Sequence, residues 1–104
     1  MDSSKPNIPV ACSLSDAQLR EREATLLAEF ESAVIAREEL PAGYLFHLPG
    51  QDTCLLLIAN LLAAERQCCP FLSFALHASP NHGPLALSIT GPDGTKEFLR
   101  SLFF

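Results

Sequence analysis

Residues 65–71 read E-R-Q-C-C-P-F, and this segment sets the junction between the most apolar helix of the chain and the strand that follows it. Proline lacks an amide hydrogen and restricts the residue before it to extended geometry. Pro70 therefore ends a helix that is capped by Asp52 or Thr53 and runs to about Gln67. This helix is apolar around most of its circumference, which predicts a central, well-covered position in the fold.

The chain before this helix predicts an earlier one. Ser15 and Gln18 have the spacing of a capping box, and Leu, Phe and Val then recur at helical spacing. These features predict a helix over residues 16–38, and Pro41 and Gly43 end it.

Three strands are expected, each with apolar side chains at alternate positions. They cover residues 44–48, 71–78 and 85–90. Turn-forming residues at 80–84 join the last two strands so closely that these should pair antiparallel. A short helix that begins near Thr95 closes the chain.

The expected order is α-β-α-β-β-α, which predicts an α+β fold, a two-layer sandwich with a three-stranded sheet covered by helices. A chain of 104 residues fits one domain. We assign this domain to residues 12–104. Residues 1–11 are polar and contain two prolines, so we expect a flexible N-terminal arm there.

Composition restricts the classes of partner. The net charge is −5 and the basic residues are scattered, whereas a nucleic-acid site would gather Lys and Arg against the phosphates. The apolar stretch at residues 54–64 is interrupted by Asn60 and is too short for a membrane span, which needs about 20 residues. The polar N-terminal residues lack the apolar region of a signal peptide. We therefore expect a cytoplasmic protein with no nucleic-acid and no membrane partner.

In a reducing compartment, four cysteines indicate metal binding, redox chemistry or burial rather than a disulfide framework. The Cα atoms of Cys68 and Cys69 are about 3.8 Å apart, so a disulfide between these neighbours would be strained. Two thiolates could instead share one soft cation, with Cys12 as the candidate third thiolate. Because Pro70 forces Cys69 out of helical geometry, we expect its side chain to diverge from that of Cys68 and to turn toward Cys12.

Three further side chains are candidates to support this site, namely Glu65, Arg66 and His77. The negative end of a helix dipole disfavours a thiolate, and the Arg66 guanidinium would offset that effect. Glu65 and Arg66 have an alternative role in surface ion pairs on a solvated helix face. The cysteines have an alternative role as buried packing residues.

The motif Glu-Arg-x-Cys-Cys-Pro-Phe at residues 65–71, with Ala-Cys-x-Leu at residues 11–14, resembles a family of short, uncharacterised bacterial proteins. The resemblance covers nearly the whole chain. Further matching positions are Tyr44, Phe46 and residues 83–84 and 90–92. The resemblance implies that Cys12, Cys68 and Cys69 are matched positions, that the fourth cysteine is not, and that the family is associated with heavy-metal resistance.

The leading hypothesis is a small cytoplasmic thiol protein that binds a soft metal or metalloid ion (Hg, Cu(I), Zn or As) through Cys12, Cys68 and Cys69. It would act as a buffer, a carrier or a sensor accessory. One alternative is a thiol-disulfide redox protein, in which Cys69 reacts and Cys12 or Cys68 resolves the product. Another is a protein-interaction module with structural cysteines, in which the segment at residues 101–104, ending in Phe103 and Phe104, forms an exposed apolar patch for a partner, with a homodimer as one form of that interaction. No catalytic motif of serine, histidine and aspartate or of paired carboxylates is present, which favours binding over catalysis.

Overall fold

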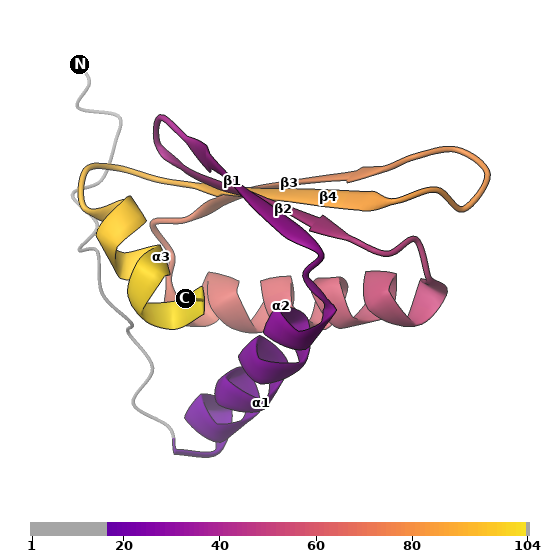
Figure 1. The fold of residues 1–104 in the computed structure, drawn as a ribbon. Coiled ribbons are helices and arrows are strands. Elements are labelled where there is room, and N and C mark those ends of the chain that lie inside the picture. The colour runs from indigo at the N-terminus through magenta and orange to yellow at the C-terminus, as the bar shows by residue number, and fades with distance from the viewer. Residues whose placement is uncertain (1–16, 104) are drawn as a thin grey trace.

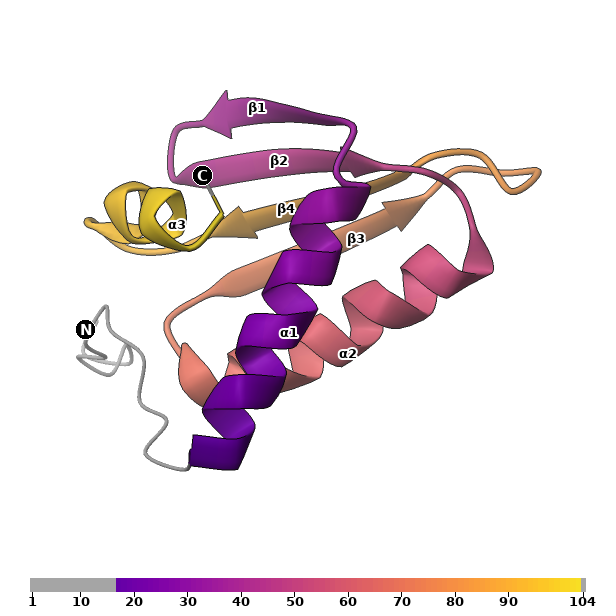
Figure 2. The ribbon, with the colours of Figure 1, turned by 60° about the horizontal axis from the view of Figure 1, so that its bottom comes forward.

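Residues 17–103 are described by a computed structural model, and within them three helices and four strands follow the order α-β-β-α-β-β-α. The elements are α1 (Ala17–Ala33), β1 (Ala36–Leu40), β2 (Gly43–Leu48), α2 (Asp52–Cys68), β3 (Ser73–Ala78), β4 (Leu85–Thr90) and α3 (Thr95–Phe103). The strands form one antiparallel sheet in the order β1-β2-β4-β3. All three helices lie on the same side of this sheet (Figure 1, Figure 2). The fold is α+β.

The predicted three-stranded sheet is wrong, because residues 36–40 form a fourth strand. The sequence predicted a first helix over residues 16–38, but α1 ends at Ala33. The chain turns into the sheet at once, since the amide of Ile35 donates a hydrogen bond to the carbonyl oxygen of His47 on β2, at 2.7 Å. The order predicted from the sequence therefore lacked the hairpin of β1 and β2.

Tertiary contacts explain why this segment is a strand. A two-residue turn, residues 41–42, closes the hairpin. Arg37 donates a hydrogen bond to the carbonyl oxygen of Phe103 at the end of α3, at 3.1 Å. Glu39 forms an ion pair with Lys96, also on α3. These partners are distant in sequence, so the contacts outweigh a helical periodicity that is purely local.

The two central strands, β2 and β4, carry the core. Their alternate side chains are buried and meet in register, with Tyr44 opposite Ile89, Phe46 opposite Leu87 and Leu48 opposite Leu85. The rings of Phe30 on α1, Phe46 on β2 and Phe103 on α3 contact one another, with centroids 5.3 to 5.5 Å apart. This three-ring contact joins two helices to the same central strand.

Two predictions about partners concern the ends and the surface of the fold, namely a homodimer interface at the C-terminal residues and the absence of a membrane partner. Phe103 is buried in the core, so it adds nothing to an exposed apolar patch, and Phe104 lies outside the described residues. The homodimer therefore stays a prediction, and the proposed N-terminal arm also lies outside the described residues. Within residues 17–103, no helix combines the length and the apolar character needed to cross a membrane.

Candidate metal centre

The pair of cysteines stands at the end of α2. Cys68 is the last helical residue, and the amide of Cys69 still donates a hydrogen bond to the carbonyl oxygen of Glu65, at 2.6 Å. The backbone of Cys69 has φ −127° and ψ 72°, which is outside helical geometry, as expected for a residue before Pro70. The helix thus ends within one residue of its predicted end.

Aromatic packing fixes the chain just beyond the cysteines. Phe71 is buried and its ring meets that of Phe98 on α3 edge-on, with centroids 5.1 Å apart. Together with Cys68 and Cys69 it forms a small apolar cluster apart from the main core. Phe71 therefore packs the segment that joins α2 to β3 against α3. This packing restricts how far the two cysteines can move.

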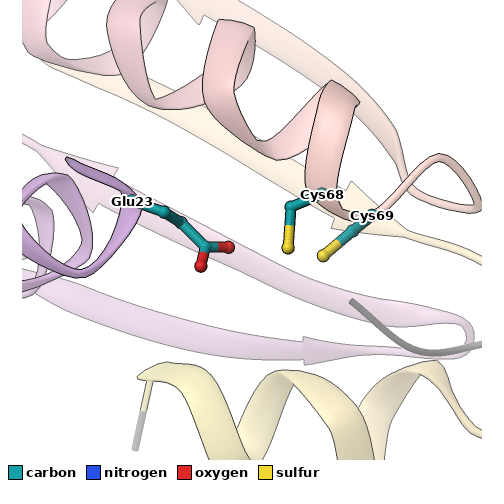
Figure 3. Close-up of side chains that lie close together, drawn as sticks. All are labelled: Glu23, Cys68 and Cys69. Atoms are coloured by element: carbon teal, nitrogen blue, oxygen red, sulfur yellow. The ribbon is translucent and has the colours of Figure 1, made fainter. Parts of the chain in front are cut away.

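The side chains of Cys68 and Cys69 converge rather than diverge. Figure 3 shows both sulfurs on the side of α2 that faces Glu23, which projects toward them from α1. One carboxylate oxygen of Glu23 and the two sulfurs all lie within 4.8 Å of one another. The expectation that Cys69 would turn away from Cys68 is wrong, because leaving helical geometry at Cys69 brings its side chain beside that of its neighbour. Cys12, toward which Cys69 was expected to turn, lies outside the described residues.

Glu23 is the member of this group that the sequence reasoning missed. It is only 8% exposed. It precedes the buried Leu26 by three residues and the buried Phe30 by seven, so it shares their face of α1. The sequence signal for Glu23 was a carboxylate at a position on the helix face that packs into the core. Its proximity to the cysteines depends on the packing of α1 against α2, which the sequence pattern alone does not give.

Glu65 lies one turn before the cysteines and is 1% exposed. Strict hydrogen-bond geometry gives no partner among the described residues to either of its carboxyl oxygens or to Oε2 of Glu23, but the carboxyl of Glu23 and the thiol of Cys69 lie close enough to Glu65 to act on its pKa. Burial, and next the neighbouring carboxyl of Glu23, raise the pKa of Glu65 to about 8. A buried polar group without a partner costs about 1–3 kcal/mol, so this corner carries a penalty that a bound cation would offset.

The two sulfurs are in different chemical states. Cys68 is disulfide-bonded, and Cys69 has a free thiol. Burial, followed by the nearby Glu65 and Glu23, raises the pKa of the Cys69 thiol well above its ordinary value. The Cys69 thiol is therefore protonated at neutral pH, and only a strong electrostatic partner such as a metal ion would convert it to a thiolate.

The other predicted site residues lie apart from this group. Arg66 is exposed on α2. His77 is exposed on β3 and pairs in register with Ala86, so it lies on the face of the sheet opposite the buried residues of β4. The free thiol of Cys54 is buried in the main core at the start of α2, and burial raises its pKa. The structure thus brings together Glu65, Cys68 and Cys69 of the predicted residues and adds Glu23.

Comparison with models of known protein families, with curated proteins and with solved structures found no match to this chain. The resemblance to short bacterial proteins with a Cys-Cys-Pro-Phe motif therefore stays an expectation from the sequence.

Proposed function

We propose that the chain, once Cys68 is reduced, binds a soft metal or metalloid ion through the thiolates of Cys68 and Cys69. The observation that carries the proposal is the convergence of two sulfurs and a carboxylate oxygen within 4.8 Å at a buried position. Such a protein would serve as a metal buffer, a carrier or a sensor accessory. Cys12 as a further ligand remains part of the prediction.

The spacing suits a shared ion. An ion with metal–sulfur bonds of about 2.3 Å holds two tetrahedral ligands about 3.8 Å apart. Ligand atoms that begin no more than 4.8 Å apart therefore need to move by about 1 Å at most to bind one ion. Rotation of a cysteine or glutamate side chain supplies such a movement without a change of fold.

The charges of the site support the same proposal. The carboxyl of Glu65 and the thiol of Cys69 hold their protons more tightly than exposed groups do, as the raised pKa of each indicates. A metal ion replaces those protons, because ligands must be deprotonated to bind it. The bound ion would neutralise negative charge that the buried site cannot otherwise accommodate.

The disulfide at Cys68 restricts where this function operates. A sulfur in a disulfide is not a thiolate ligand, so the site is complete only after reduction. Reducing conditions prevail in the cytoplasm, where we propose that the protein acts.

The first prediction is a titration of the reduced protein under anaerobic conditions with Hg(II), Cu(I), Zn(II) and arsenite. We expect a thiolate charge-transfer band with at least one of these ions, and we expect its loss in Cys69→Ser and in Cys68→Ser. The matched control is Cys54→Ser, which removes a buried thiol of the main core and leaves the site intact. A reduced wild-type protein that shows no band with any of the four would end the proposal.

A thiol-disulfide redox protein is the second candidate, because a free thiol at Cys69 adjoins a disulfide at Cys68. Exchange begins with a thiolate, and the buried, high-pKa thiol of Cys69 is poorly suited to form one. The rate of alkylation of Cys69 in Cys54→Ser decides between the two. Fast alkylation of Cys69 below pH 8 would favour redox chemistry, and protection of Cys69 in the folded protein would count against it.

A further inference from the structure

The position of Glu23 is unusual for a residue with a purely structural role. Its neighbours on the same face of α1, Leu26 and Phe30, are buried apolar residues. A carboxyl group at such a position is costly unless it is paired or binds a cation. Its Oε2 atom is buried and, among the residues described, has no hydrogen-bond partner.

The carboxyl of Glu23 is directed at the two sulfurs rather than at solvent (Figure 3). Its oxygen is within 4.8 Å of both sulfurs, so it lies at the distance of a third ligand. The ligands would come from two helices, since Glu23 is on α1 and the cysteines end α2. A site that spans two packed helices has its geometry set by the fold rather than by one flexible loop.

We infer that Glu23 is a direct oxygen ligand and that this mixed sulfur and oxygen site takes a divalent cation of the Zn(II) class in preference to Cu(I). This inference rests on the proposed metal-binding function and adds a ligand and a selectivity to it. It also narrows the range of ions that two thiolates alone would accept.

Donor chemistry supports the preference for this class of ion. Thiolate ligands favour Cu(I), whereas Zn(II) is bound by thiolates and by carboxylate oxygens, most often with four tetrahedral ligands. A hard oxygen ligand beside two sulfurs therefore contributes more to the binding of Zn(II) than to that of Cu(I).

Charge supports the same preference. After reduction of Cys68 and loss of the thiol protons to a bound ion, two thiolates and one carboxylate would carry three negative charges in a buried position. A divalent cation leaves a net charge of −1 and a monovalent cation leaves −2. Because uncompensated charge is expensive to bury, the divalent ion is favoured.

The test compares wild type with Glu23→Gln, which keeps the shape of the side chain and removes its negative charge. Glu21→Gln is the matched control, because it removes the same charge from an exposed position on the same helix. The reduced proteins compete with chromophoric chelators for Zn(II) and, separately, for Cu(I). We expect Glu23→Gln to weaken Zn(II) binding by at least about 10-fold and Cu(I) binding by less than about 3-fold, with no change in Glu21→Gln.

The outcomes of this test distinguish a failure of the inference about Glu23 from a failure of the proposed metal-binding function. Equal Zn(II) affinity in wild type and Glu23→Gln, with binding abolished by Cys69→Ser, would overturn the role of Glu23 and leave the thiolate site standing. Failure of wild type to bind Zn(II) or Cu(I) would overturn the inference, and the proposed function would fall with it only if Hg(II) and arsenite also failed to bind. X-ray absorption of the Zn(II)-loaded wild-type protein tests the ligand without any variant: sulfur together with an oxygen neighbour at about 2.0–2.2 Å is expected, and a shell of sulfur alone contradicts the inference.

Discussion

At the scale of single residues, the carboxyl of Glu65 links the chemistry of the site to the stability of the fold. It is buried beside Glu23 and the cysteines, and burial is the largest cause of its raised pKa. A carboxyl with a higher pKa in the folded protein than in the unfolded chain binds its proton more tightly when folded. Its protonation therefore stabilises the metal-free fold.

The resulting prediction concerns the pH dependence of stability. Below about pH 4.5 both states hold the proton, and as pH rises the unfolded chain loses it first, while the folded state keeps it up to about pH 8. The free energy of unfolding of the metal-free protein should thus fall between these values, by up to about 1.4 kcal/mol per pH unit from this group. Glu65→Gln should remove this contribution. Urea unfolding of both proteins across pH 5–8 measures it, and parallel curves would contradict the assignment.

The predictability of the site differs between its residues for a physical reason. Cys68 and Cys69 belong to one local motif, so the sequence alone was enough to propose them as candidates, and Glu65 lies within the same helical turn. Glu23 is on another helix, and only the packing of α1 on α2 brings it to the sulfurs. A polar residue on the otherwise apolar face of a predicted helix is the sequence pattern that would indicate a residue such as Glu23.

At the scale of elements, β1 shows how contacts distant in sequence determine a secondary structure. Residues 36–40 have charged side chains and no alternation of apolar residues, so the helical pattern before them extended naturally across them. Their conformation depends on pairing with β2 and on contacts with α3. The other strands were predictable because apolar side chains alternate along their sequences, and in β2 and β4 the alternate residues are buried.

The contact between Arg37 and the end of α3 yields a prediction for this edge. Arg37→Ala removes the hydrogen bond to the carbonyl oxygen of Phe103 and should lower the free energy of unfolding by about 1 kcal/mol. The control is Arg20→Ala, which removes an exposed arginine of α1. Urea unfolding compares the two variants. Equal stability of the two would show that the contact does not hold β1 against α3.

At the scale of the whole molecule, α1 takes part both in the main core and in the proposed metal site. The three-ring contact of Phe30, Phe46 and Phe103 holds α1 to the sheet, and Glu23 extends from the same helix toward the end of α2. An ion bound by Glu23 and the cysteines would join α1 to the C-terminal end of α2. Because the unfolded chain does not hold these ligands together, metal binding should stabilise the whole fold.

The last prediction is a thermal stabilisation that requires reduction. Zn(II) at a free concentration of about 100 times its dissociation constant should add about 2.7 kcal/mol to the free energy of unfolding of the reduced protein. For a domain of this size that amounts to about 10–20 °C in Tm. The protein with its Cys68 disulfide intact should show little or no shift, because one of the sulfur ligands is blocked. Scanning calorimetry of both forms, with reduced Cys69→Ser as control, measures the effect, and an equal shift in all three would mean that Zn(II) stabilises the protein from somewhere other than the junction of α2 and β3.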